Sequence, residues 1–174
     1  MKDTVDKLNS FLQGELSAVE TYKMALEKVK KPQIKSILSD CQCSHTERVA
    51  ILTRMVTECG GTPAANSGPW GQFAKFVAGG ATAIGEEAAV GSLEEGETQG
   101  IQSYQNELPN LDSRAAKIVE TQILPGQERT YKIISDLKRD FSKLATQAGP
   151  VKINPKMGRE LARMPVEECT FRHF

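Results

Sequence analysis

Two glutamates at core positions of predicted helices are the residues whose chemistry most needs explaining. Glu15 lies in GELSAVETY, residues 14–22, in phase with apolar residues that alternate in steps of three and four. The residues of this stripe are Val5, Leu8, Leu12, Val19, Tyr22, Leu26 and Val29. Such spacing is typical of one buried helix face, so we expect the Glu15 carboxylate to face the core rather than solvent.

An internal repeat supplies the second glutamate. The segment GELSAVETYKMAL, residues 14–26, aligns with GETQGIQSYQNEL, residues 96–108. This alignment pairs Glu15 with Glu97 and Tyr22 with Tyr104. If the helix pairs built on the two copies are related by an approximate twofold axis, Glu15 and Glu97 face each other across the core. We interpret Tyr22 and Tyr104 as core tyrosines on the same faces, two turns further on.

Six side chains at matching helical offsets predict a metal site. In a di-metal carboxylate bundle, two helices each give one glutamate and two give Glu-x-x-His, because residues three apart point the same way. Here two segments give Glu15 and Glu97, and two give Gln42-x-x-His45 and Glu128-x-x-Tyr131. Iron or manganese suits carboxylate and imidazole ligands. The predicted metal ligands are therefore Glu15, Gln42, His45, Glu97, Glu128 and Tyr131.

Four long helices are predicted to position these residues. We expect them at about residues 3–31, 32–59, 86–108 and 112–145, with Pro32 opening the second and Pro125 kinking the fourth. No useful run with the β period occurs, so the predicted class is all-α. Short connections imply two antiparallel pairs, and the linker 60–85 is long enough to cross the bundle between helices two and three. The predicted bundle spans residues 1–147, and an irregular C-terminal tail spans 148–174.

The four-helix layout and its ligand spacing resemble the ferritin-like superfamily. More narrowly, LNSFLQGELSAVETYKMALEKV, the segment around His45, GGTPAANSGPWGQFAKFV and LEEGETQGIQSY resemble a bacterial ferritin-like family, the domain of unknown function 2383. The resemblance covers about residues 4–142. It implies a metal site with Glu15, His45, Glu97 and Glu128 as ligands, iron or another divalent transition metal as cofactor, and a role in iron handling or oxidative stress. In such proteins, a tyrosine at this offset can hydrogen-bond a ligand carboxylate.

Two hypotheses for function stay open. Gln42 stands where a bridging glutamate would be and Tyr131 where a second histidine would be, so ligand charge is lower than in a full di-metal site. The first hypothesis is a degenerate di-metal site, and an oxygen-activating oxidase is disfavoured. The second is a metal-free helical interaction or oligomerisation module with a buried hydrogen-bond network, which needs raised carboxylate pKa values, shared protons or water. Cys41 and His45, four apart, are a weaker candidate for zinc.

The composition restricts the expected partners. Lysine plus arginine equals aspartate plus glutamate at 22 each, so nothing favours nucleic acid or an anionic membrane. No segment has the roughly 18 apolar residues of a membrane span, and the N-terminus has no apolar signal core. We expect a soluble, cytoplasmic homo-oligomer. The crossover around Trp70, Phe73 and Phe76 is expected to pack on the bundle, and the tail on the bundle or on a neighbouring subunit.

Overall fold

The computed structural model describes residues 2–71 and 85–146, and these residues are helical without any β-strand. The elements in chain order are α1 (Lys2–Lys28), α2 (Pro32–Glu58), the 3₁₀ turn η1 (Gly68–Trp70), α4 (Glu86–Glu107), the 3₁₀ turn η2 (Leu108–Asn110), α5 (Ser113–Ile118), the π-helical segment η3 (Val119–Ile123) and α6 (Leu124–Thr146). The all-α expectation is confirmed for this part of the chain. The predictions for Phe73, Phe76 and the tail concern residues outside it.

Local chemistry explains where the helices begin and end. Pro32 is the first residue of α2, where its missing N–H costs no helical hydrogen bond. Gly60, just past α2, has a φ of 75°, a conformation that glycine adopts without strain. Asp112 caps α5, because its carboxylate accepts hydrogen bonds from the backbone N–H groups of Arg114 and Ala115.

The fourth predicted helix is a continuous run of α5, η3 and α6. The irregularity expected at Pro125 lies one turn earlier, as the π-helical segment η3. Proline has no N–H to donate to the carbonyl four residues before it, so the regular ladder of hydrogen bonds is interrupted there. A π turn carries an extra residue and changes the phase in which side chains face the core.

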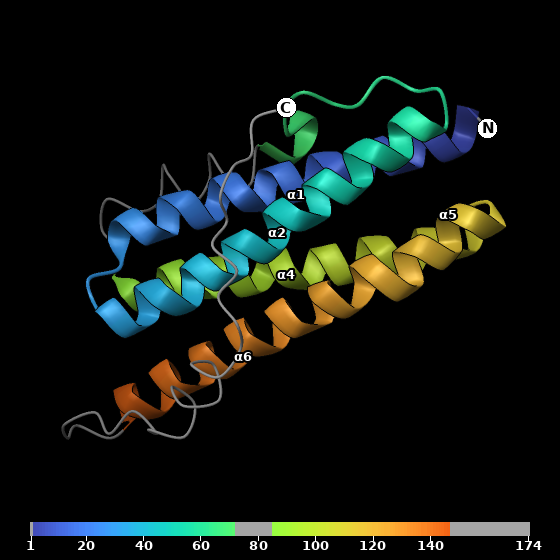
Figure 1. The fold of residues 1–174 in the computed structure, drawn as a ribbon. Helices are drawn as coiled ribbons and strands as arrows, with labels where there is room; N and C mark the ends of the chain where they lie inside the picture. Colours follow the sequence, from blue (N-terminus) through green and yellow to red (C-terminus); the bar gives the residue numbers. More distant parts are fainter. Residues whose placement is uncertain (1, 72–84, 147–174) are drawn as a thin grey trace.

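The four long helices lie lengthwise side by side (Figure 1). Their buried residues form two apolar clusters. The first cluster is Tyr22, Ala25, Val29, Ile34, Leu38, Cys41, Ala89, Val90, Leu93, Ile134 and Leu137. The second is Leu8, Phe11, Leu12, Leu52, Met55, Val56, Tyr104, Ala115, Val119 and Ile123. Each long helix contributes to the first cluster at one end, and a layer of buried polar residues separates the two.

Residues 59–71 lie along α1 and are fixed to it by side-chain hydrogen bonds. Asn9 donates to the carbonyl of Thr62 at 3.0 Å and accepts from the N–H of Ala64 at 2.8 Å. Further along α1, Ser17 donates to the carbonyl of Trp70 at 2.8 Å. Trp70 is thereby positioned over the middle of α1.

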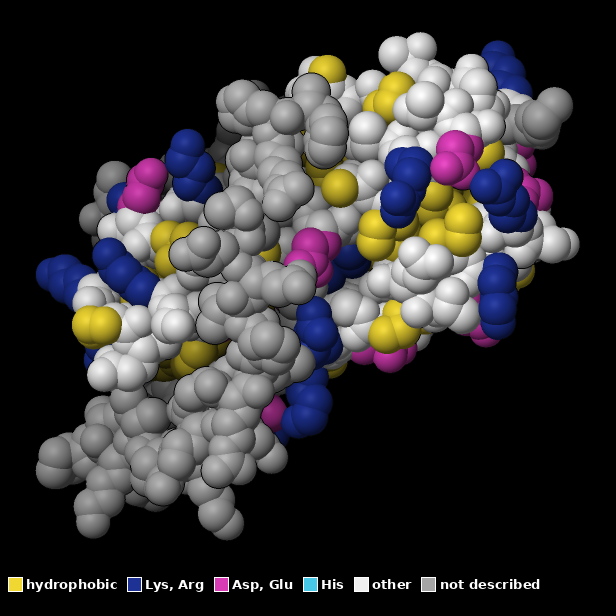
Figure 2. Space-filling view, viewed as in Figure 1, with side chains coloured by type: hydrophobic (Ala, Val, Ile, Leu, Met, Phe, Trp, Pro, Cys, Tyr) yellow, Lys and Arg dark blue, Asp and Glu magenta, His cyan; other side chains and the backbone are white. Residues whose placement is uncertain are grey.

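The face shown in Figure 2 carries both signs of charge. On the face shown in Figure 2, Lys and Arg side chains alternate with Asp and Glu, and small groups of hydrophobic side chains lie between them. Within residues 2–71 and 85–146, no helix combines the length and the apolar character that crossing a membrane requires.

Candidate functional site: a buried polar network

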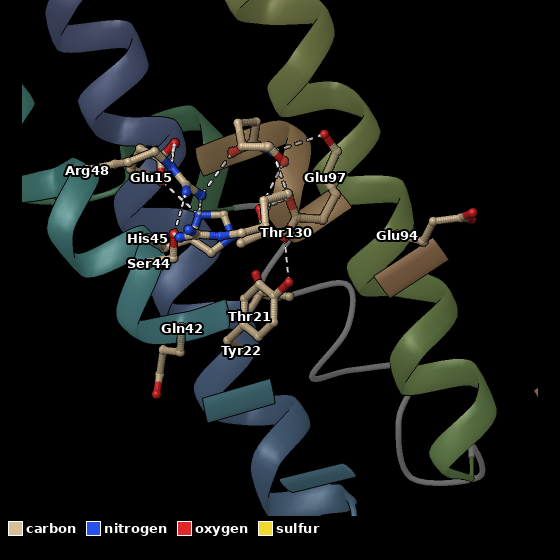
Figure 3. Close-up of polar contacts among 12 residues, drawn as sticks. Glu15, Thr21, Tyr22, Gln42, Ser44, His45, Arg48, Glu94, Glu97 and Thr130 are labelled. Atoms are coloured by element: carbon tan, nitrogen blue, oxygen red, sulfur yellow. Dashed lines mark hydrogen bonds and ion pairs between the residues drawn. The ribbon is translucent and has the colours of Figure 1, made fainter. Parts of the chain in front are cut away.

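Three of the six predicted ligands converge between the two apolar clusters. His45 Nδ1 lies 2.7 Å from Glu15 Oε2, and His45 Nε2 lies 2.9 Å from Glu97 Oε1. Each of these residues is at most 3% exposed. Figure 3 shows the imidazole of α2 between the carboxylates of α1 and α4. The two glutamates of the repeat therefore meet through one histidine ring.

The tyrosines of the repeat bond crosswise to the glutamates. Tyr22 of α1 donates its hydroxyl proton to Glu97 of α4. Tyr104 of α4 donates to Glu15 of α1 at 2.6 Å. Each copy of the Glu-x6-Tyr motif thus completes the other, which explains why both residue types recur at the same spacing.

A buried arginine that sequence reasoning missed occupies the centre of the network. The Arg48 side chain is 2% exposed, with Nε donating to Glu15 at 2.9 Å and Nη1 to Ser44 at 3.0 Å. Its Nη2 donates to Gln127 Oε1 at 3.0 Å and lies 2.6 Å from His45 Nδ1. The sequence does contain a signal for Arg48. The buried-face spacing of α2 leaves a step of seven residues from His45 to Leu52, and Arg48 lies at the intermediate position that the helical period places on the same face.

From α6, Gln127 and Thr130 face the network. Gln127 Nε2 donates to Glu97 Oε2 at 2.6 Å, and Thr130 Oγ1 donates to the same oxygen at 2.8 Å. The other predicted residues lie elsewhere: Glu128 is exposed and Tyr131 is half-buried. Gln127 and Thr130 are in phase with the buried apolar residues Ile123 of η3 and Ile134 and Leu137 of α6, and this spacing turns them inward.

Gln42 is also separate from the other predicted ligands. Its amide donates to the backbone carbonyl of Val19 at 3.0 Å, and in Figure 3 it points away from the carboxylates. Cys41 lies in the first apolar cluster with a free thiol. Burial raises the pKa of Cys41 to about 12, so the thiol stays protonated among its apolar neighbours.

Donors from all four long helices surround the two carboxylates. Glu97 accepts from Tyr22, His45, Gln127 and Thr130, which uses the roughly four lone-pair positions of a carboxylate. Glu15 accepts from Arg48, Tyr104 and His45. Within the described residues, every buried side-chain nitrogen or oxygen has a hydrogen-bond partner.

The charges of the network balance when His45 is an imidazolium. Burial alone would raise the pKa of Glu15, but the charges of Arg48 and His45 lower it to about 2. Burial would lower the pKa of His45, but the Glu15 charge and hydrogen bonds to both glutamates raise it. We therefore assign protons to both ring nitrogens, so that Nδ1 donates to Glu15 and the nearby Arg48 Nη2 donates to Gln127. Two carboxylates then face one guanidinium and one imidazolium.

This donor set does not fit a pair of metal ions. A di-metal bundle requires anionic ligands from the second and fourth helices, whereas α2 contributes the cation Arg48 and α6 contributes the neutral Gln127 and Thr130. In the part of the chain that the structure describes, no three His, Cys, Asp or Glu side chains are arranged to hold a metal ion.

A cavity of about 60 Å³ between α1 and α4 reaches the network. Small residues form its walls, among them Gly14, Ala18, Gly96 and Gly100, and Trp70 of η1 also lines it. Glu15, Tyr22, His45, Glu97, Tyr104 and Gln127 also line it. One buried water needs roughly 10–15 Å³, so the cavity has room for a few waters or one small polar molecule.

The fold and the site together define a class: a helical protein packed around a buried carboxylate–imidazole–guanidinium network. The sequence model of one family, described as Domain of unknown function (DUF2383), matches residues 3–110, more than half of the 174-residue chain. The chain belongs to this family. The matched region includes Glu15, His45, Arg48 and Glu97 and ends before the α6 residues of the network. No curated protein and no solved structure matched the chain.

Proposed function

We propose that the protein is a ferritin-like, antiparallel four-helix bundle with a crossover between α2 and α4. The order of the two apolar clusters supports this proposal: α1 and α6 pass from the second cluster to the first, whereas α2 and α4 pass from the first to the second. The crossover is supported by its two ends. Thr62 and Ala64 bond to Asn9 near the start of α1. At the opposite end of α1, Glu86 of α4 accepts from the N–H groups of Lys30 and Lys31, which follow the last residue of α1.

We propose further that the bundle keeps its carboxylates buried without a metal and acts as a cytoplasmic interaction module that forms homo-oligomers. The observation that carries the metal-free part is Arg48, whose guanidinium lies between Glu15 and Gln127 and supplies the charge that an ion would supply. The three buried hydrogen bonds of Arg48 fix the helices α1, α2 and α6 relative to one another. Such a core suits a rigid scaffold whose outer surface binds other chains.

A second candidate function is the binding of one divalent transition-metal ion such as iron, in iron handling or oxidative stress. The convergence of two carboxylates on one imidazole, at 2.7 and 2.9 Å, favours this candidate. It requires the guanidinium of Arg48 to leave Glu15, and it leaves Gln42, Glu128 and Tyr131 outside the site. A full oxygen-activating di-iron centre has no such support.

Metal analysis separates the two candidates. The full-length protein is purified without chelator, its metal content is measured, and ferrous iron is then added in air. We expect no stoichiometric metal and iron oxidation no faster than in buffer, because Arg48 already neutralises the carboxylates. One metal ion per chain that is lost in Glu15→Ala, but retained in the exposed control Glu27→Ala, would overturn the metal-free proposal.

The interaction role has its own test. Light scattering coupled to gel filtration measures the mass of the full chain over a wide concentration range. We expect one discrete oligomer whose mass does not depend on added chelator. A monomer at all concentrations would refute homo-oligomerisation and leave the metal result unaffected.

A further inference from the structure

We propose that the core of this protein is a cation site that the chain fills with its own Arg48 side chain, and that the emptied site binds a small guanidinium ion. This inference rests on the proposed metal-free function. It assigns a ligand class, planar organic cations with a fork of N–H donors, to a site that is otherwise closed by the protein itself.

The acceptors around the guanidinium are held in place by residues other than Arg48. Glu15 Oε1 accepts from Arg48 and also from Tyr104, while Glu15 Oε2 faces His45. Gln127 Oε1 accepts from Arg48 while its amide nitrogen donates to Glu97. Removal of the Arg48 side chain therefore leaves these acceptors in position, as a preorganised site requires.

The shape of the site also matches a flat group. Gly126 on α6 lies against the guanidinium: a Cβ at this position would be 3.2 Å from Arg48 Nη1 and 3.7 Å from Ser44 Oγ. The absence of a side chain there lets the α6 backbone approach the cation. Glu15 and Gln127, which accept from the guanidinium, also line the cavity between α1 and α4.

The charge balance provides the affinity. Without the Arg48 side chain, two buried carboxylates face one imidazolium. The nearby Arg129 of α6 is exposed and donates to Ser44 Oγ at 3.2 Å rather than to either carboxylate, so it does not replace the lost cation. An unpaired buried charge strongly destabilises the folded protein. A bound cation removes this destabilisation, and that gain favours its binding. A guanidinium presents several planar N–H donors, whereas an ammonium is a point charge, so methylguanidinium suits the site better than methylammonium does.

The test is chemical rescue of Arg48→Ala. Its thermal unfolding midpoint is measured with about 10 mM methylguanidinium and, separately, with the same concentration of methylurea, a neutral molecule of similar shape. For a dissociation constant near 1 mM we expect methylguanidinium to raise the midpoint of Arg48→Ala by about 3 °C and methylurea to leave it unchanged. The wild-type protein is expected to respond to neither, because its site is filled.

Two variants make the rescue specific. Arg114→Ala removes an exposed arginine that pairs with Glu58 at 2.8 Å, and it should show no rescue. The double variant Arg48→Ala with Glu15→Gln removes the anion that attracts the guest, and its rescue should disappear. If Arg48→Ala does not fold, Arg48→Gln is refolded from urea with either additive, and a higher refolded fraction with methylguanidinium alone gives the same support.

Equal effects of the two additives, or no effect on Arg48→Ala and Arg48→Gln, would overturn the inference. A failure of the proposed function is seen in a different measurement, as metal bound to the wild-type protein. Either result can occur without the other, so the two proposals are tested separately.

Discussion

At His45, both ring nitrogens face carboxylates that the fold has removed from water, at 2.7 and 2.9 Å. Only the doubly protonated ring donates to both. Loss of the Nε2 proton leaves a lone pair facing Glu97, and loss of the Nδ1 proton leaves one that faces both Glu15 and the Arg48 Nη2 group 2.6 Å away. Either loss leaves the core with an unmatched negative charge. The protonation state of this single ring therefore determines how well α1, α2 and α4 are joined.

We predict that the free energy of unfolding falls as pH rises above about 6.5. Although burial opposes it, the Glu15 charge and the hydrogen bonds to both glutamates raise the folded-state pKa of His45 above 6.5. The contribution of His45 is therefore complete below 6.5 and is lost as pH passes the folded pKa. The pKa of Glu15 is lowered from 4.5 to about 2, so its contribution is lost as pH falls over that range. The free energy of unfolding should therefore be highest between about pH 4.5 and 6.5.

Urea unfolding between pH 3 and 9 measures this profile, and His45→Gln is the matched variant. The difference between wild type and variant should shrink above the folded pKa of His45. The chain has only two histidines, so a proton NMR titration can assign the ring resonance by its absence in the variant. A His45 ring that titrates below 6.5 would contradict the assignment.

Tyr104 tests the crossed hydrogen bonds of the repeat. Tyr104→Phe removes one of three donors to the buried Glu15 without changing the ring that packs on Phe11. We expect a loss of about 1–3 kcal/mol in the free energy of unfolding, because the carboxylate loses a partner that water cannot easily replace. The third tyrosine, Tyr131, lies outside the network, and Tyr131→Phe should change stability by less than about 0.5 kcal/mol.

On the scale of elements, the phase of α6 determines which of its side chains enter the core. The prediction of Glu128 and Tyr131 came from aligning ligand spacings with another class of site. The apolar residues of α6 itself place the neighbouring positions, Gln127 and Thr130, inward. The π-helical segment η3 before Pro125 changes the phase between α5 and α6, which a constant helical period does not anticipate.

Alanine substitutions at adjacent positions measure this phase. Gln127→Ala should lower the free energy of unfolding by about 2 kcal/mol, because Glu97 loses a donor and Arg48 an acceptor. Glu128→Ala, one residue away on the exposed face, should change it by less than about 0.5 kcal/mol. A larger loss in Glu128→Ala than in Gln127→Ala would place the opposite face of α6 in the core. Chemical denaturation of both variants at one pH gives the comparison.

For the whole molecule, the two apolar clusters act as separate sources of stability on either side of the polar network. Leu38 belongs to the first cluster and Leu52 to the second, and both are fully buried on α2. We expect Leu38→Ala and Leu52→Ala each to cost about 2–5 kcal/mol. In the double variant the costs should add to within about 0.5 kcal/mol, since the clusters share no residue. A strongly non-additive result in urea unfolding would mean that the network couples the clusters.

Much of the architecture was predictable from local patterns. Patterns within single segments predicted the all-α class and the start of α2 at Pro32. The same kind of pattern predicted that the side chains of Glu15 and His45 are buried. The repeat predicted that Glu15 and Glu97 face each other, and the structure brings both to His45. What could not be predicted is what a side chain meets: Arg48 lies in phase with the core, but only tertiary packing pairs it with Glu15 and Gln127.

The paired repeat also has a consequence for how the halves of the chain depend on each other. Glutamate and tyrosine recur in α1 and α4, but both cationic residues that contact the carboxylates, His45 and Arg48, come from α2. If α6 carried a second copy of His45 and Arg48, four cations would face two carboxylates. If α2 carried a copy of the neutral Gln127 and Thr130 instead, no cation would face them. The two helix pairs are therefore unlike: the network residues of α1 and α2 include Glu15, His45 and Arg48, whereas those of α4 and α6 include the carboxylate Glu97 and the neutral Gln127 and Thr130. Neither pair combined with a second copy of itself would reproduce this core.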